Sequence, residues 1–356
     1  MKTLPTGTLI LLMFAAPACG NQLVEFGRGD NPNGGDVDAG NPGGNNPPTV
    51  IATGPSNAAA NVSITRRVDA TFSRVMAPAT LNSASFTVQQ GATALVGAVS
   101  YTASTATFVP NHPLDLSLEY TATITTGAAD PAGTALASNY IWTFTTGACS
   151  QAPVILRSAG TLAVLAGSAV TSTGLTSVTG DLGVSPGTAV SGFPPGNLVG
   201  AQHAGDPAGA LALGDLTTAY NDAAARTLCP VTVAGNLGGR TLVPGLYKST
   251  SSLEITSGDL TLDAQGDPDA VFIFQMASTL TTTSGRQVIL SGGAKAANVF
   301  WQVGSSATLG TTSVFHGTIM ADQAITLGTG AILSGRVLAR IAGVALDSNT
   351  IVMPAP

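Results

Sequence analysis

Charged, aromatic, histidine and cysteine residues are all scarce in this 356-residue chain. Charged residues make up 9% of the sequence, against about a quarter in ordinary soluble domains. The 13 basic residues form no patch and the net charge is −6, so we expect no nucleic-acid partner. His203 and His316 are far apart and lack metal-ligand spacing, so we expect no metal and no cofactor.

The sequence also offers little for catalysis. It contains no phosphate-binding glycine loop between a strand and a helix. Polysaccharide lyases and hydrolases need clustered carboxylates or basic groups in a groove. The charged residues of the C-terminal half are instead scattered: Glu254, Asp322, Asp347, Arg286, Lys295, Arg336 and Arg340. We therefore expect a protein that is not an enzyme.

What the sequence does contain is a repeat in residues 298–352. Ser306-Ala-Thr308-Leu309 returns as Ala324-Ile-Thr326-Leu327 and again as Gly343-Val-Ala345-Leu346, at intervals of 18 or 19 residues. Two other apolar strings alternate with it, VFWQV/GTIMA/GRVLA and SVFHG/AILSG/NTIV. Three short strands per period predict a mainly β fold, a parallel β-helix or β-solenoid with one coil per repeat.

The second strand of each coil has small, mostly hydroxyl-bearing residues on its outward side. Alternation directs Leu and Ile inward and leaves the following residues outside: Glu254, Thr256, Thr279, Thr281, Ser306, Thr308, Ala324, Thr326, Gly343 and Ala345. Coils stack about 4.8 Å apart and alternate residues lie about 6.7 Å apart, which predicts a flat two-column grid. Such a grid can order water through its hydroxyls. Threonine is also simply a favourable solvent-facing strand residue, and Glu254, Ala324, Gly343 and Ala345 interrupt the pattern.

One amphipathic helix is predicted at about 207–228. Asp206 can cap it and Pro207 suits its first turn. Its apolar stripe comprises Leu213, Leu216, Tyr220, Ala223 and Ala224. Strands 271–274 and 299–303 are apolar on both sides, so we expect the helix to cover that face of the β-helix. The preceding Gly- and Pro-rich segment, about 180–210, predicts an irregular loop that caps one end, without ladder strands.

Residues 49–147 alternate with period two, as in Val68/Ala70/Phe72 and Trp142/Phe144, and predict an N-terminal β-sandwich. Strings such as GPSNAAANVSITRRVDATFSRVMAPATLNSASFTV and YTATITTGAADPAGTALASNYIWTFTTG resemble the bacterial Ig-like domain of surface-layer and adhesive proteins. The resemblance implies a spacer or stalk.

Residues 154–352, within an expected C-terminal domain of residues 150–356, resemble the ice-binding-protein-like family. The similarity lies in LAVLAGSAVTSTGLTSVTGDLGVSPGTAVSGFPPG, GDLTTAYNDAAAR and ANVFWQVGSSATLGTTSVFHGTIMADQAITLGTGAILSGRVLAR. It implies a right-handed β-helix with three faces, a long flanking helix, and ice binding through a flat exposed face. The ice-binding residues expected here are Thr256, Thr279, Thr281, Ser306, Thr308, Ala324, Thr326 and Ala345.

The first residues are typical of an export signal. Lys2 precedes the apolar run 9–14, and small residues lead to Cys19. The resemblance of this arrangement to a lipobox implies cleavage before Cys19 and its lipidation, which anchors the chain to the bacterial outer membrane. An ordinary secretory peptide with an incidental cysteine is the alternative. Residues 1–18 are thus the expected signal peptide and 19–48, rich in Asn, Gly and Pro, a disordered linker.

Two further features leave alternatives open. Cys149 and Cys229 of an exported chain could form a disulfide or remain buried free thiols. Asp263, Asp267 and Asp269 lie in a bulge between coils that could hold calcium, although a solvated Asp- and Gly-rich turn is the commoner outcome.

The sequence as a whole predicts a monomeric, surface-anchored protein that adsorbs to an ice crystal surface. The alternative is a cell-surface adhesin or structural module that binds glycan or protein through the same flat face.

Overall fold

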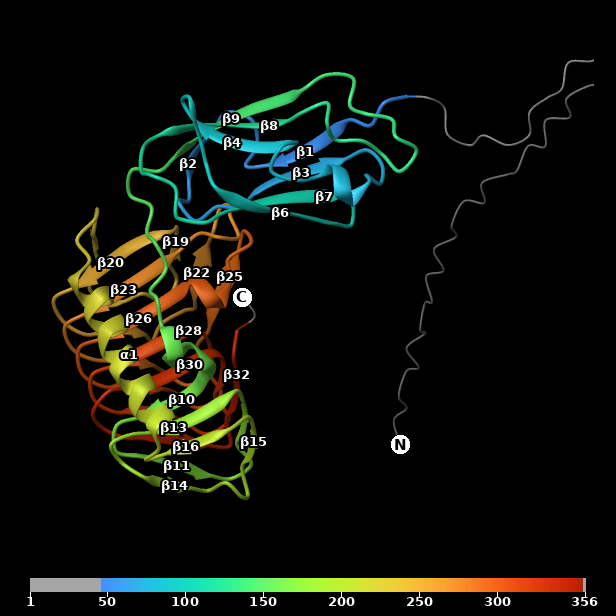
Figure 1. Ribbon diagram of the computed structural model, residues 1–356. Coiled ribbons are helices and arrows are strands. Elements are labelled where there is room, and N and C mark those ends of the chain that lie inside the picture. The colour runs from blue at the N-terminus through green and yellow to red at the C-terminus, as the bar shows by residue number, and fades with distance from the viewer. Residues whose placement is uncertain (1–45, 355–356) are drawn as a thin grey trace, which may run out of the picture. The chain divides into compact units, whose positions relative to one another are not determined.

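The computed structural model describes residues 46–354, which form two β domains (Figure 1). The expected signal peptide, Cys19 and most of the linker lie outside these residues. Within 46–354, no helix combines the length and hydrophobicity needed to cross a bilayer.

The N-terminal domain is a sandwich of two sheets, with strand orders β1-β3-β7-β6 and β2-β9-β8-β4-β5. Its strands are β1 (Val50–Gly54), β2 (Ala59–Val62), β3 (Val68–Phe72), β4 (Phe86–Gln90), β5 (Thr93–Ala94), β6 (Gly97–Thr102), β7 (Thr105–Pro110), β8 (Glu119–Ile124) and β9 (Tyr140–Thr146), with one 3₁₀ turn, η1 (Pro78–Thr80). The alternation in β3, β8 and β9 places every second side chain in the core, as predicted. The ring of Phe86 lies between Phe108 and Trp142, with centroids 5.9 and 6.0 Å away.

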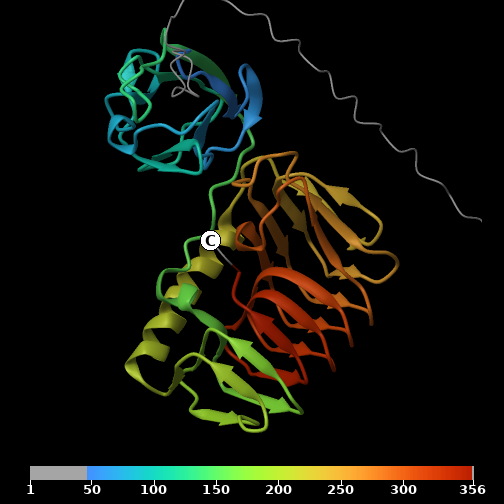
Figure 2. The ribbon, with the colours of Figure 1, turned by 90° about the vertical axis from the view of Figure 1, so that its right-hand side faces the viewer.

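The C-terminal domain is the predicted parallel β-helix, and its coils present three faces (Figure 2). The helix-covered face consists of β17 (Val231–Thr232), β20 (Gly245–Ser249), β23 (Phe272–Met276), β26 (Val299–Val303), the second halves of β28 (Val314–Ala321) and β30 (Ile332–Ala339), then β10 (Leu162–Ala166), β13 (Asp181–Val184) and β16 (Gln202–Ala204).

The second sheet, called here the threonine face, consists of β18 (Gly235–Asn236), β21 (Leu253–Ile255), β24 (Leu280–Thr282), β27 (Ala307–Leu309), β29 (Ile325–Leu327), β31 (Val344–Asp347), β11 (Ala169–Thr173) and β14 (Ala189–Ser191). The third face contains β19 (Thr241–Leu242), β22 (Leu260–Asp263), β25 (Val288–Ser291), the first halves of β28 and β30, β32 (Thr350–Val352), β12 (Ser177–Thr179) and β15 (Asn197–Val199). Two 3₁₀ turns, η2 (Arg157–Thr161) and η3 (Ala296–Asn298), directly precede β10 and β26.

The coils do not stack in chain order. The last coil stacks on the first, through the pairs β30–β10, β31–β11 and β32–β12. The next coil, β13 to β15, and the strand β16 after it extend the stack away from that junction. α1 (Pro207–Ala225) then precedes β17 and β18, which pair at the opposite edge of the stack. Figure 2 shows the consequence, with red coils lying directly against green ones.

The capping loop predicted at about 180–210 is therefore wrong, because this segment contains four ladder strands, β13 to β16. Its glycines lie at corners where two coils nearly touch. A Cβ on Gly187 would lie 1.8 Å from the Ser168 carbonyl oxygen, and one on Gly192 would lie 1.9 Å from that of Ser172. A high glycine content here reflects close coil-to-coil approach rather than the absence of strands.

The interior of the β-helix is held by a row of aromatic rings. Tyr247, Phe274 and Trp301 stack on successive coils, with centroids 5.2 and 4.0 Å apart, and Phe315 follows at 5.0 Å. Such ring pairs contribute about 0.5–1.5 kcal/mol each beyond their buried area. The stack fixes the rotation of each coil against the next.

Helix α1 lies along the helix-covered face, as predicted, and packs on Ile273, Phe300 and Met320. The Asp206 carboxylate caps it by accepting from the Gly209 N–H at 2.8 Å. Its buried stripe is Ala212, Leu216, Ala219, Tyr220 and Ala223. Leu213 is only partly buried, and the predicted Ala224 is exposed.

The helix ends at Ala225, three residues before the predicted end, because tertiary contacts terminate it. The Gln275 side-chain amide donates to the carbonyls of Ala223 at 2.5 Å and Arg226 at 2.9 Å. Arg226 itself has extended backbone angles. Its side chain pairs with Asp222, four residues earlier, at 2.7 Å and also donates to the Pro153 carbonyl at 3.1 Å.

Replacement of Gln275 by leucine should lower the free energy of unfolding by about 1–3 kcal/mol, because buried carbonyls at the end of α1 lose their donor. Urea denaturation followed by circular dichroism measures this. Gln287→Leu is the matched control, since Gln287 is exposed and its side chain makes no hydrogen bond within residues 46–354. Equal destabilisation by both variants would contradict a capping role for Gln275.

Candidate surface-binding face

The threonine face carries two straight columns of outward side chains. In the central column the parallel register aligns one residue from each of eight strands: Asn236, Glu254, Thr281, Thr308, Thr326, Ala345, Thr171 and Ser191. The flanking column lies two residues earlier in each coil: Ser252, Thr279, Ser306, Ala324, Gly343, Ala169 and Ala189. The inward residues of the same strands are buried, as alternation predicts.

The two columns differ in what their hydroxyls do. In the flanking column, the Thr279 hydroxyl donates to the Ser252 hydroxyl at 2.9 Å, and the Ser306 hydroxyl accepts from the Ala324 N–H at 3.3 Å. Within residues 46–354, the hydroxyls of Thr171, Thr308 and Thr326 make no hydrogen bond to protein, and these side chains are exposed. The central column therefore offers regularly spaced donors and acceptors to an outside partner.

The face is uncharged over most of its length. Glu254 is the one charged member of the columns and lies near one end. Asp347 follows the central column at the margin of the face. Its pKa is lowered chiefly by a hydrogen bond from the Thr329 hydroxyl, so this carboxylate stays ionised. Neither column contains an aromatic residue. The face therefore has no ring on which a sugar could stack.

Most sequence-predicted site residues come together on this face. Thr279, Thr281, Ser306, Thr308, Ala324, Thr326 and Ala345 occupy the two columns. Thr256 lies outside both. It follows β21 at a corner, where its N–H donates to the Asn236 side-chain oxygen at 2.9 Å and its carbonyl accepts from the Thr283 hydroxyl at 3.1 Å.

The scattered charged residues do not form a catalytic group. Asp322 pairs with Arg340 at 2.7 Å, Arg286 with Asp259 at 3.5 Å. The guanidinium of Arg340 also lies 4.5 Å over the Tyr220 ring, which ties α1 to the β-helix. Burial lowers the pKa of His316, which keeps its ring neutral. In the described part of the chain, no three His, Cys, Asp or Glu side chains converge in a way that could hold a metal ion.

The sulfur atoms of Cys149 and Cys229 form a disulfide. The aspartate bulge is neither a solvated turn nor a convergent metal site. Asp263 accepts from the N–H of Gln265 within its own loop. Asp267 and Asp269 contact the N-terminal domain, as described below.

Known proteins share this architecture. An ice-binding protein of Nostoc sp. (strain HG1) is 44% identical over 198 residues, which span 55% of this chain and 73% of that protein. The crystal structure of an ice-binding protein from an Antarctic biological consortium is 58% identical, with a TM-score of 0.57, and the match covers 58% of this chain and 93% of that one. The structure of the ice-binding protein from the Antarctic ascomycete Antarctomyces psychrotrophicus is 39% identical, with a TM-score of 0.55, covering 58% and 100%.

The model of the ice-binding-like family matches residues 164–352. The chain belongs to the ice-binding-like family. A bacterial Ig-like domain model matches residues 44–146, in agreement with the sandwich. Relatives in this family are binding proteins by name, consistent with the scattered charges of the described residues.

For this ice-binding-like chain, sequence reasoning missed Asn236 and two hydroxyl-bearing members of the central column, Thr171 and Ser191. Both precede α1 in the chain, and they join the column only because the first coils stack on the last. The similarity of Ala169-Val-Thr171 to Ala324-Ile-Thr326 was the available signal.

Proposed function

We propose that this protein binds ice by adsorption of the threonine face, without turnover or cofactor. The observation that carries the proposal is the central column, in which exposed threonine hydroxyls that make no hydrogen bond to protein within residues 46–354 recur in register on a nearly uncharged sheet. Coil stacking repeats the hydroxyls about every 4.8 Å along the column. Membership of the ice-binding-like family supports ice as the partner.

The chemistry of the two columns favours an ordered water surface over a soluble ligand. Hydroxyls that are fixed by the ladder hold waters in a regular array, while the intervening methyl groups exclude others. Most of the flanking column is half-buried, and its hydroxyls bond to one another or to backbone. It therefore offers fewer unbonded hydroxyls than the central column, which supplies the hydrogen bonds to the partner.

Thr308→Tyr combined with Thr326→Tyr should abolish ice shaping and freezing hysteresis, because two bulky rings break the flat contact. Both positions are exposed, so the free energy of unfolding should change by less than about 0.5 kcal/mol per site. Observation of a single ice crystal in the purified protein measures the effect. The matched control is Thr218→Tyr on the exposed side of α1, which should keep full activity. Unshaped crystals in the wild-type protein would refute ice binding itself.

Ala345→Thr should raise freezing hysteresis at equal protein concentration. It replaces the methyl that separates Thr326 from Thr171 in the central column, so that Thr281 to Thr171 becomes an unbroken run. Nanolitre osmometry of the variant and the wild type makes the comparison. Glu254→Gln, next to the end of the same column, is the control that changes a side chain without extending this run. Unchanged or lower hysteresis in Ala345→Thr would contradict continuity of hydroxyls as the active property.

The proposal includes export and lipid attachment at Cys19, supported by the apolar run and small residues before this cysteine. Dual acylation provides stable membrane attachment, which a single chain does not. Cys19→Ser should abolish fatty-acid labelling and move the protein from the membrane fraction to the soluble fraction. Unaltered fractionation of the variant would argue for an unlipidated secreted protein.

A further inference from the structure

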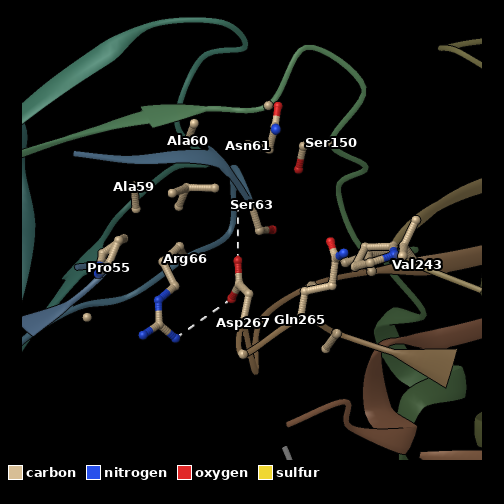
Figure 3. A pocket seen from close by; sticks show the side chains of 18 of the residues that line it. Pro55, Ala59, Ala60, Asn61, Ser63, Arg66, Ser150, Val243, Gln265 and Asp267 are labelled. Atoms are coloured by element: carbon tan, nitrogen blue, oxygen red, sulfur yellow. Dashed lines mark hydrogen bonds and ion pairs between the residues drawn. The ribbon is translucent and has the colours of Figure 1, made fainter. Parts of the chain in front are cut away.

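The loop after β22 extends toward the Ig-like domain and contacts it through two aspartates. The Asp267 carboxylate accepts from the Ser63 N–H at 3.0 Å, and the Asp269 carboxylate accepts from the Arg67 N–H at 3.1 Å. The Thr65 hydroxyl donates to the Asp269 carbonyl at 2.6 Å. Figure 3 shows Ser63 and Arg66 directed at Asp267 across the cavity, of about 660 Å³, that these segments line.

Two of the three donors in this contact are backbone N–H groups, whose positions are fixed by the path of the chain. All the donors above come from residues 63–67, the short segment between β2 and β3. A backbone N–H cannot rotate independently of the chain segment that carries it, so each N–H···carboxylate bond restrains this segment and the strands on either side of it, not only one side chain.

Charge complementarity reinforces the contact. Arg66 lies 3.7 Å from Asp267 and 3.6 Å from Asp269, and its side chain is only 12% exposed. Arg67 approaches Asp269 at 3.8 Å, and Lys295 approaches it at 4.0 Å. Burial raises the pKa of Asp267, whereas bonds from the Asp269 and Ser63 N–H groups and the charge of Arg66 act against that rise.

The chain segment that connects the two domains is short, so it allows little movement of one domain relative to the other. β9 ends at Thr146, and Cys149 is already joined to Cys229 of the β-helix, so two residues, Gly147 and Ala148, separate them. Gln151 then donates to the Leu228 carbonyl at 3.1 Å. Two residues span about 7 Å when extended, which keeps residues 63–67 at high effective concentration near their partners.

We propose that Asp267 and Asp269 form a docking site for residues 63–67, so that the Ig-like domain is a rigid extension of the β-helix rather than a swinging spacer. The disulfide limits the distance between the domains, and the aspartates fix their relative orientation. The threonine face then keeps one orientation relative to the N-terminal end of the Ig-like domain. This inference concerns the joint alone and does not depend on ice binding.

Distance measurement by pulsed electron spin resonance tests the joint in the full chain. Nitroxide amino acids are inserted at the exposed positions Ala94 and Thr311, so that the native disulfide stays intact. The wild type should give one narrow distance distribution. Asp267→Lys combined with Asp269→Lys should lose that narrow peak, because Arg66 and Arg67 are then repelled.

Two variants make the result decisive. Asp263→Lys makes one Asp-to-Lys change at the end of β22, just before this loop, at a residue whose carboxylate accepts from the Gln265 N–H, and it should keep the narrow peak. Arg67→Glu should broaden the distribution, because the new carboxylate is repelled by Asp269. Thermal unfolding of each variant establishes that both domains remain folded. A broad distribution in the wild type, or equal broadening by Asp263→Lys, would overturn the proposal.

Discussion

Parallel stacking in strict register is the constraint on which the rest of this molecule depends. Each coil of the β-helix hydrogen-bonds to its neighbours through all three faces, so one residue per strand aligns into a column without any specific side-chain contact. The same register builds the inner row of Tyr247, Phe274 and Trp301 and the outer row of Thr281, Thr308 and Thr326. Core stability and surface regularity thus have one cause, and a one-residue slip would remove both.

The stacking order adds a second constraint. Because the last coil pairs with the first, strands about 170 residues apart in sequence must meet before the stack is complete, and contacts of such separation make folding slow. Helix α1 makes this order possible, since it spans the helix-covered face between the two groups of coils. Gln275 at its C-terminal end and Tyr220 with Arg340 along its length tie it to strands of the later group.

Repeat spacing and alternation in the sequence predicted the β-helix, its inward residues, the sandwich and the face covered by α1. They failed where tertiary contacts override local pattern. The glycines of 180–210 suggested a loop, yet Gly187 and Gly192 are needed where coils touch. Thr256 fits the alternation but lies at a corner. Thr171 and Ser191 belong to the central column for a topological reason, because sequence periodicity cannot show that the first coil lies beside the last. Likewise, no local signal pairs Asp267 with Ser63, which lies 204 residues away.

Adsorption of the threonine face to ice is the central claim, and the most direct measurement is incorporation of the fluorescently labelled full chain into a growing single-crystal ice hemisphere. Adsorption through a flat, regular hydroxyl column predicts bright label confined to defined crystal planes at dilutions where an inert protein is excluded. Exclusion of the label from every plane, to the same extent as the inert protein, would contradict it.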